Sequence, residues 1–473
     1  MKLTLRPLPG RRLAEQLREA GVEFPCGGEG ICGGCRVRVL DGKIPVTEPM
    51  RQPSASSRGL SSWRMAETSR PVTVEVEQWS IRVLSDEAGT AVEPRRGWGV
   101  AVDLGTTTVV AQLVHLETGE IEGIETALNA QARFGADVMS RIQHELRHPG
   151  ELRQVIRDQL GAMLRRLAAG RRISEVLLVG NTAMHHLFCG LDVAPLAGVP
   201  FLSPNTGEQS FGPDEMPWRA PTTFLPCLGG FVGSDLLAGV VATRLDRAAD
   251  QQALFDIGTN GEIVVAWRRS LRCASTAAGP AFEGGRIRHG MRACEGAIDA
   301  VRLENGRLAP HVIGDTEPRG ICGSGLVDAA ARALDAGLLL PNGRLKESPL
   351  PLAPGIEITQ SDIRQLQLAK GAMAVGMKLL ARDAVRLRLA GAFGNYLHPG
   401  SAKRIGLLPE DVEVEPAGNA ALRGARMLLL EPSSRQQRIR RILALTEHVE
   451  LAADPSFQDV FAESMRLEPY RLR

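Results

Sequence analysis

One element occurs twice in the chain, and it restricts the folds that the chain can adopt. "GVAVDLGTTTVVAQLVHLETGE" is an apolar strand that ends at Asp103, followed by Gly105, three threonines and a second apolar strand. "ALFDIGTNGEIVVAW" repeats this plan with Asp256, Gly258 and another strand after the turn. Glycine, threonine and asparagine favour turns in general, so one copy alone is compatible with an ordinary hairpin. Two copies, each with an aspartate two residues before a glycine, predict a pair of hairpins with a shared function.

The residue types at the mouths of these hairpins suit a polyphosphate. Glycine lets the backbone approach a ligand, successive N–H groups form a concavity for anionic oxygens, and threonine hydroxyls are further donors. An aspartate at the strand end can hold Mg²⁺, often through water, and the ion bridges to the phosphates. We therefore predict that Asp103 and Asp256 handle Mg²⁺–ATP. The predicted phosphate-binding residues are Gly105, Thr106, Thr107, Gly258, Thr259 and Asn260. The sequence has no Gly-x-x-x-x-Gly-Lys-Ser/Thr motif, which excludes a P-loop site.

Two later segments suit the other end of a nucleotide. "GICGSGLVDAAARAL" is a tight glycine turn that opens a helix expected to start near Leu326, and "LRLAGAFGNYL" is an apolar strand interrupted by glycines. Glycine turns are common, so each segment alone is a weak signal. The nucleotide-binding residues predicted here are Gly323, Ser324, Gly325, Gly391, Gly394 and Asn395.

From Trp98 onward, strands, helices and glycine-rich turns alternate, which predicts an α/β body. One amphipathic helix is expected in "PGELRQVIRDQLGAMLRRLAAG", between Pro149 and Gly170. The two hairpins followed by the two glycine segments resemble the superfamily of acetate and sugar kinases, heat-shock chaperones and actin, the ASKHA ATPases. The resemblance implies two lobes with ATP in the cleft between them. In kinases of this superfamily an aspartate between the hairpins acts as base, and Asp235 of "GGFVGSD" has that place; a helix N-terminal residue is the alternative.

The stretch "PCGGEGICGGCRV" places Cys26, Cys32 and Cys35 in a glycine-rich loop that precedes a strand. This spacing resembles the binding loop of plant-type 2Fe–2S ferredoxins, which has one residue fewer between the first two cysteines. The glycines allow backbone N–H groups to approach the sulfurs, which tunes the potential of a cluster. Zinc is the rival metal, but the region has no second Cys-x2-Cys pair and no nearby histidine. The three cysteines are therefore expected to hold iron–sulfur.

A ferredoxin-like front on an ASKHA-type body resembles the ATP-dependent reductive activators of corrinoid proteins, which serve methyltransferases. "LLVGNTAMHHLFCG", "LPCLGGFVGSDLLAG", "AGPAFEGGRIRHGMRACEGAIDAVRL" and "HVELAADPSFQDVFAESMRL" extend the resemblance over nearly the whole chain. It implies an N-terminal β-grasp ferredoxin-like domain, then a two-lobed actin- or sugar-kinase-like ATPase body. It further implies a 2Fe–2S cluster, ATP, Mg²⁺, an external electron donor and a homodimer. The implied activity is ATP-driven reduction of cobalt, Co(II) to Co(I), in a corrinoid-binding methyltransferase protein.

The fourth ligand of the cluster departs from this family. Relatives carry a cysteine in a stretch resembling "WRxAC", whereas this chain reads "WRMAETSRPVTVEV" with Glu67 at that position. Three thiolates could be completed by an oxygen ligand, Glu67 or Ser69; a distant cysteine or a second subunit could supply the ligand; or the cluster has been lost. We favour the first two because the three-cysteine loop is otherwise intact. The other cysteines are expected to be buried small apolar residues: Cys189, Cys227, Cys273, Cys294 and Cys322.

Length and charge are compatible with this organisation. The chain has 473 residues, with 56 basic against 54 acidic side chains, which gives no electrostatic reason to expect a nucleic-acid or membrane partner. The start lacks the apolar core of a signal peptide, so a cytoplasmic location is expected. The expected divisions are a ferredoxin-like domain at 1–84, a linker at 85–97, lobe I at 98–250, and lobe II with the C-terminal segment at 251–473. Two other functions use the same core: an ATP-driven binding switch with a degraded cluster site, and a small-molecule kinase.

Overall fold

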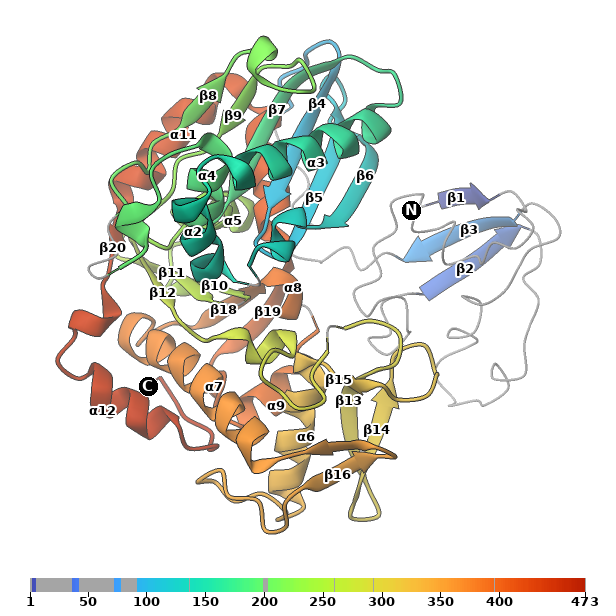
Figure 1. The fold of residues 1–473 in the computed structure, drawn as a ribbon, viewed down its shortest axis with the longest axis vertical. Helices are drawn as coiled ribbons and strands as arrows, with labels where there is room; N and C mark the ends of the chain where they lie inside the picture. Colours follow the sequence, from blue (N-terminus) through green and yellow to red (C-terminus); the bar gives the residue numbers. More distant parts are fainter. Residues whose placement is uncertain are drawn as a thin grey trace.

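A computed structural model of the protein describes residues 2–5, 36–41, 72–77, 92–135, 137–198, 203–258, 260–291, 293–394 and 396–472. Near the N-terminus, β1 (Lys2–Leu5), β2 (Arg36–Asp41) and β3 (Val72–Glu77) form an antiparallel sheet in the order β1-β3-β2 (Figure 1). Val74 of the central strand is opposite both Leu3 and Val39. The strands expected in "CRVRVL" and "PVTVEVEQW" are therefore present.

Lobe I is built on a six-stranded sheet in the order β6-β5-β4-β7-β9-β8. Its first three strands form an antiparallel meander, and β7 then pairs in parallel with β4, and β9 in parallel with β7. The strands are β4 (Trp98–Leu104), β5 (Thr108–His115), β6 (Ile121–Leu128), β7 (Ile173–Gly180), β8 (Gln209–Phe211) and β9 (Thr222–Phe224). The helices are α2 (Val138–Arg147), α3 (Glu151–Ala168), α4 (Thr182–Cys189) and α5 (Ser234–Thr243).

The amphipathic helix expected between Pro149 and Gly170 is α3. Its apolar stripe includes Leu152, Ile156 and Leu160, which are buried in one core with Val100 and other side chains of the lobe I sheet. The helix ends where Ala169 and Gly170 adopt left-handed conformations, with φ of 47° and 86°. The sequence periodicity and its terminator thus predicted this helix correctly.

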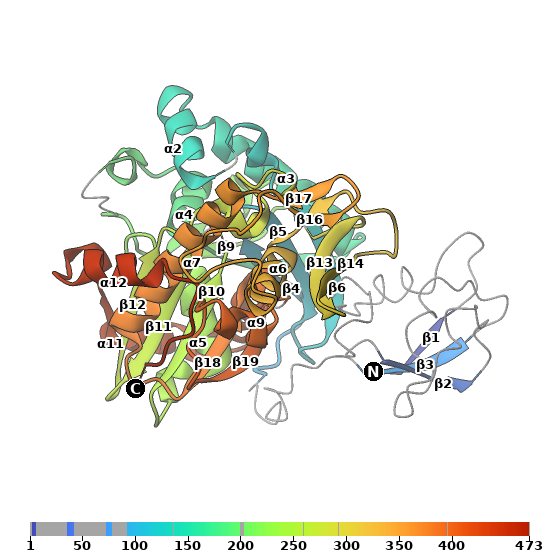
Figure 2. The ribbon, with the colours of Figure 1, turned by 90° about the horizontal axis from the view of Figure 1, so that it is seen from below.

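Lobe II repeats the plan of lobe I, with a sheet in the order β19-β18-β10-β11-β12-β20 (Figure 2). β10, β11 and β12 form the meander, β18 is parallel to β10, and β19 is parallel to β18. These strands are β10 (Gln252–Ile257), β11 (Gly261–Trp267), β12 (Ser270–Thr276), β18 (Arg386–Ala390), β19 (Glu413–Gly418) and β20 (Thr446–His448). The duplicated sequence element therefore belongs to a duplicated fold, and the predicted fold class is confirmed.

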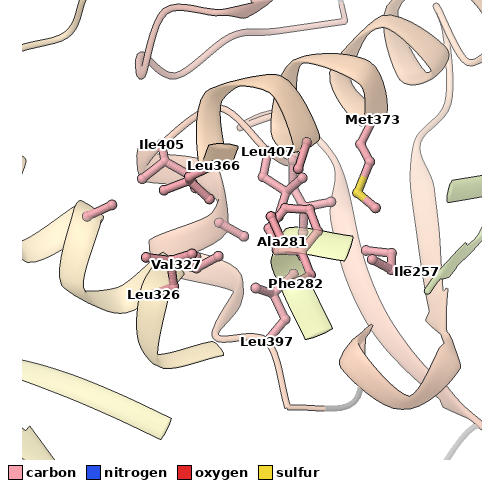
Figure 3. Close-up of a cluster of buried hydrophobic side chains, with 14 of the residues drawn as sticks. Ile257, Ala281, Phe282, Leu326, Val327, Leu366, Met373, Leu397, Ile405 and Leu407 are labelled. Atoms are coloured by element: carbon pink, nitrogen blue, oxygen red, sulfur yellow. The ribbon is translucent and has the colours of Figure 1, made fainter. Parts of the chain in front are cut away.

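Further elements lie between and after the strands of the lobe II sheet. The additional strands are β13 (Ala297–Glu304), β14 (Arg307–Val312), β15 (Gly320–Ile321), β16 (Leu350–Ala353) and β17 (Ile356–Ile358). The helices are α6 (Gly323–Asp335), α7 (Gln360–Leu380), α8 (Gly391–Gly394), α9 (Pro399–Arg404), α10 (Ala420–Leu430), α11 (Pro432–Leu445) and α12 (Phe457–Ser464). α6 begins at Gly323, three residues before the expected start, because the buried glycine turn is itself the first helical turn. Figure 3 shows Phe282, Leu326 and Met373 in the core beside α6 and α7.

A third core joins the two lobes. It contains Leu177 of β7 together with Leu254 of β10, along with side chains of α5 and α10. These helices touch closely, since a Cβ at Gly424 would overlap the carbonyl oxygen of Ala238. Among the described residues, no helix is both long and apolar enough to cross a membrane.

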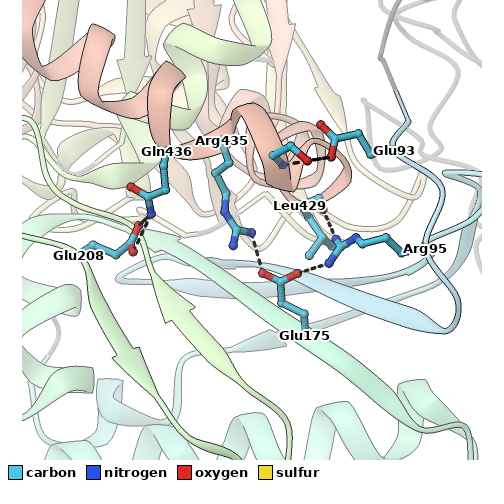
Figure 4. A network of polar contacts seen from close by, with 8 residues as sticks. Glu93, Arg95, Glu175, Glu208, Leu429, Arg435 and Gln436 are labelled. Atoms are coloured by element: carbon cyan, nitrogen blue, oxygen red, sulfur yellow. Dashed lines mark hydrogen bonds and ion pairs between the residues drawn. The ribbon is translucent and has the colours of Figure 1, made fainter.

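The segment that enters lobe I is fastened to the body by a polar network (Figure 4). Glu175 of β7 accepts hydrogen bonds from Arg95 at 2.8 Å and from Arg435 of α11 at 2.6 Å. Arg95 also donates to the carbonyl oxygen of Leu429, and the backbone N–H of Ser433 donates to Glu93. Residues 92–97, which the sequence assigns to the linker, therefore have a fixed course along lobe I.

Candidate nucleotide site

Asp103 and Asp256 occupy equivalent places at the ends of β4 and β10, each one residue before the strand ends. A glycine from the neighbouring parallel strand or its continuation approaches each end. A Cβ at Gly180 would lie 2.6 Å from the carbonyl oxygen of Leu104, and a Cβ at Gly391 would overlap the Asp256 carboxylate. Gly391 also has a φ of 83°, which a side chain disfavours. Glycine is therefore required at both positions if the aspartates are to stay at the edges of their sheets.

The residues after each aspartate form the two expected turns. The N–H of Gly105 donates to the carbonyl oxygen of Thr108 at 3.0 Å, and the N–H of Gly258 donates to that of Asn260 at 2.9 Å. Thr106 Oγ1 accepts a hydrogen bond from Asn181 Nδ2 at 2.8 Å. Thr259 and Asn395 lie outside the described residues.

Asp235 lies in the first turn of α5, directly after a close contact within lobe I. A Cβ at Gly233 would overlap the carbonyl oxygen of Gly180 and the Cα of Asn181, so only glycine allows the helix to begin there. The N–H of Leu236 donates to Asp235 Oδ1 at 2.8 Å. The carboxylate interacts electrostatically with Asp256 and Asp103, so all three predicted catalytic aspartates share one region.

Two further polar side chains, which the sequence analysis did not predict, lie in this region. Glu262 of β11 is directly opposite Asp256 in the β10–β11 ladder, and cross-strand partners project from the same face of a sheet. Asn419, the residue before α10, donates from Nδ2 to Asp103 Oδ2 at 2.8 Å. The signal for Glu262 was visible in "DIGTNGE" as a carboxylate across the turn, whereas Asn419 reaches the site only through the tertiary fold.

Burial raises the pKa values of all four carboxylates, and the charges of neighbouring carboxylates raise three of them further. Burial raises the pKa of Asp103 to about 6, against a hydrogen bond from Asn419 that lowers it. Burial and the charge of Asp103 raise the pKa of Asp256 to about 7. Burial, Asp256 and Asp103 raise the pKa of Asp235 to about 8, and burial followed by Asp235 and Asp256 raises that of Glu262 well above its ordinary value. The site therefore concentrates negative charge that protons or a cation must offset.

The described carboxylates are not arranged to coordinate a metal ion by themselves. In the part of the chain that the structure describes, no three His, Cys, Asp or Glu side chains are grouped closely enough to hold one. A divalent cation here would need oxygens from phosphate and water to complete its shell. The arrangement suits a metal that arrives with a nucleotide.

The raised pKa values predict a pH-dependent stability. At pH 6 to 8 the folded protein keeps protons on Asp235 and Asp256 that the unfolded chain has released, so folding binds protons. These bound protons stabilise the folded state fully below about pH 4, which is near the pKa of aspartate in the unfolded chain. The stabilisation is lost as the pH rises to about 8, at up to about 1.4 kcal/mol per pH unit for each proton. We expect the melting temperature of the nucleotide-free protein to fall between pH 6 and 8, and Asp235→Asn to reduce this slope. A slope unchanged in that variant would contradict the assignment.

The glycines before and inside the α6 turn have a packing role. A Cβ at Gly323 would overlap the carbonyl oxygen of Phe282, and a Cβ at Gly325 would overlap that of Ile298. Ser324 is buried, with its hydroxyl 3.3 Å from Cys322 Sγ. Gly394 ends α8. Their part in nucleotide binding stays a prediction.

Cys26, Cys32, Cys35 and Glu67 lie outside the described residues. Of the five described cysteines, Cys227, Cys273 and Cys322 are buried, Cys189 is half-buried and Cys294 is exposed. The expectation that all five are buried is therefore wrong for Cys294, which lies in a surface loop. Burial raises the pKa of Cys227 and Cys273 to about 12, which disfavours the thiolate that a metal needs. If a distant cysteine completes the cluster, Cys294 is the accessible one among those described.

The duplicated sheet with paired aspartates at its strand ends defines a two-lobed ATPase body of the ASKHA type, preceded by a small antiparallel sheet. Family models match three successive regions: a 2Fe–2S iron–sulfur cluster binding domain at residues 2–60, the RACo middle region at 98–248, and the C-terminal ASKHA domain of RACo at 250–472. The chain belongs to the RACo family of reductive activators.

Similar proteins fit this assignment. The chain is 36% identical over 414 residues to the corrinoid activation enzyme RamQ of Eubacterium limosum, covering 77% of this chain and 69% of that protein. It is 27% identical over 430 residues to the [Co(II) methylated amine-specific corrinoid protein] reductase of Methanosarcina barkeri, covering 79% of each. The structure of a reductive activator for a corrinoid iron–sulfur protein has the same fold, with a TM-score of 0.71, 24% identity and 98% coverage of both chains.

Proposed function

We propose that this protein reduces the cobalt of a corrinoid-binding methyltransferase protein from Co(II) to Co(I) and uses ATP hydrolysis to drive the transfer. The observation that carries the proposal is the joining, in one chain, of a region that matches 2Fe–2S domains to a duplicated ASKHA body with paired aspartates. An iron–sulfur domain has no role in a simple kinase. Similar proteins named as corrinoid activator and reductase support the choice of partner.

The donor set fits a 2Fe–2S cluster with one non-thiolate position. Cys26, Cys32 and Cys35 would supply three thiolates, with Glu67 or Ser69 as the fourth ligand. When bound, such a cluster supplies a one-electron carrier: Co(II) gains one electron, and an external donor restores it. The glycine-rich sequence around the cysteines would give backbone N–H groups access to the sulfurs, which would tune the potential of the cluster.

On the ATP side, we assign the hairpin turns at Gly105–Thr107 and at Gly258–Asn260 to the phosphates. Asp103 and Asp256 would orient Mg²⁺ through its water ligands. Asp235, whose pKa lies at about 8 without nucleotide, would accept a proton from the attacking water once the charge of a nearby cation favours its ionised form. The hydroxyls and N–H groups of the turns would hold the phosphates in line with that water.

The remaining parts of the proposal follow the family resemblance. The ferredoxin-like domain covers 1–84, the linker 85–97, lobe I 98–250, and lobe II with the C-terminal segment 251–473. An external electron donor, a homodimer and a cytoplasmic location complete the proposal.

The test is the ATP dependence of cobalt reduction under anaerobic conditions. Protein reconstituted with iron and sulfide is mixed with a reductant and a Co(II) corrinoid protein, and loss of the Co(II) EPR signal is followed. We expect ATP to increase the rate at least about tenfold, and a non-hydrolysable analogue to have no such effect, because only hydrolysis offsets an unfavourable reduction. Equal reduction without ATP would contradict the proposal. Phosphorylation of a small acceptor would favour the kinase instead.

A further inference from the structure

Residues 279–291, "GPAFEGGRIRHGM", are not part of the carboxylate cluster, but they extend from lobe II to lobe I. They follow β12 and contain the short helix η8 (Pro280–Glu283). Thr107 Oγ1, in the phosphate turn of lobe I, donates to Glu283 Oε1 at 3.4 Å. We call residues 279–291 the bridging segment.

The bridging segment also acts electrostatically on the start of α2 in lobe I. Asp137 caps this helix, and its pKa is lowered first by the N–H of Ser140 and also by the charges of Arg141 and Arg286. Arg286 belongs to the bridging segment and holds a left-handed conformation, with φ of 61°, that non-glycine residues rarely adopt. The segment therefore faces lobe I through one hydrogen bond, from Thr107 to Glu283, and through the charge of Arg286, which acts on Asp137.

The bridging segment has a fixed course within lobe II. The N–H of Gly285 donates to the carbonyl oxygen of Pro280 at 2.8 Å, and the N–H of Arg288 donates to Asp362 Oδ1 at 2.8 Å. A Cβ at Gly290 would overlap the carbonyl oxygen of Gly284, so the segment closes tightly on itself. Glu283 is thus presented to lobe I from a rigid base.

The same base touches the other elements that the sequence assigned to the nucleotide. The buried Phe282 stacks on Phe393 of α8, with ring centroids 4.6 Å apart. The carbonyl oxygen of Phe282 lies against Gly323 at the start of α6. One short segment therefore contacts the phosphate turn, α6 and α8 together.

We propose that Glu283 is a positioning residue of the nucleotide site: without nucleotide its carboxylate accepts the Thr107 hydroxyl and bridges the lobes, and the phosphates of ATP displace it. This inference rests on the proposed function, since it assumes that ATP binds at Thr107. Phosphate oxygens and a carboxylate compete for the same hydroxyl donor, and phosphates bound at Thr107 would be repelled by a nearby carboxylate. Nucleotide binding thereby releases one lobe contact and couples phosphate occupancy to the arrangement of the lobes.

Glu283→Gln tests this competition, because the amide keeps the shape of the side chain and removes its charge. Binding of a non-hydrolysable ATP analogue is measured by calorimetry with and without Mg²⁺. Hydrogen exchange of residues 279–291 is measured by mass spectrometry. Glu304→Gln, at an exposed site on β13 of the same lobe, is the matched control, and Glu283→Ala is a second variant.

We expect Glu283→Gln to bind the Mg²⁺-free analogue about three- to tenfold more tightly than the wild-type protein, as removal of one repulsive charge predicts. In the wild-type protein the analogue should raise exchange in the bridging segment to the level that Glu283→Ala, which lacks the acceptor for Thr107, shows without it. Unchanged affinity and exchange would overturn the inference. Weaker binding of the Mg²⁺-bound analogue by Glu283→Gln would also overturn the inference, because it would indicate that Glu283 binds the cation. No binding by the wild-type protein would overturn the proposed function as well, which separates the two failures.

Discussion

Cys32→Ala is expected to abolish cobalt reduction while ATP binding stays within about twofold of the wild-type protein. A thiolate of the cluster cannot be replaced by a methyl group, and loss of one from a set of three leaves too few sulfur ligands. The proposed ATP site is formed by Asp103, Asp256 and their neighbours, which lie at the ends of β4 and β10 in the ASKHA body. Iron and acid-labile sulfide per chain, the reduced EPR spectrum, ATP affinity and corrinoid reduction measure the effect.

Two further variants of this protein identify the fourth ligand of the cluster through the same measurement of iron content. Glu67→Cys should increase the iron retained in air, since a thiolate suits iron better than a carboxylate does. Cys294→Ala should leave the iron content unchanged if the ligand is local, because Cys294 is an exposed loop residue of lobe II. Loss of iron in Cys294→Ala would instead select the distant-cysteine arrangement. If Cys32→Ala still reduced cobalt in an ATP-dependent way, the cluster would not be the electron carrier.

Local pattern was sufficient for much of the fold. The duplicated element predicted two equivalent hairpins, because an aspartate, a glycine and flanking apolar strands are encoded within about a dozen residues of each other. The helix α3 followed from a stripe with a 3.6-residue period that begins at Leu152. The start of α6 was placed too late because Gly323 sits in a helix where burial against Phe282 outweighs its low helix propensity.

The candidate site was predictable only where its residues belong to the repeat. The duplicated element predicted Asp103, Asp256 and the turn residues. The resemblance to kinases predicted Asp235. Asn419 lies 316 residues from Asp103 in sequence and meets it through the pairing of β19 with β18 and of α10 with α5. Glu283 likewise reaches Thr107 across the two lobes. Such contacts leave no periodic signal, since they arise from packing between distant elements.

Asp256→Asn is expected to lower ATP-dependent cobalt reduction and ATP hydrolysis by at least about 100-fold. Asp256 is opposite Glu262 in the β10–β11 ladder and interacts electrostatically with Asp103, and its carboxylate would orient the metal that accompanies the phosphates. Loss of a charge that positions the reacting groups costs about 10²–10³ in rate. Affinity for a non-hydrolysable ATP analogue should change by less than about tenfold, since the turn N–H groups remain. Asp214→Asn, at an exposed site, is the matched control.

The pH dependence of ATP hydrolysis distinguishes a catalytic role of Asp256 from a purely structural one. The charge of Asp256 contributes to the raised pKa values of Asp235 and Glu262, so its removal should lower both. The acidic limb of the remaining ATPase activity should therefore move to lower pH in Asp256→Asn, while the melting temperature near pH 8 rises because one repulsive charge is gone. A variant that only disturbed folding would lose stability at every pH and keep the limb in place. Hydrolysis above about a third of the wild-type rate would remove Asp256 from the site altogether.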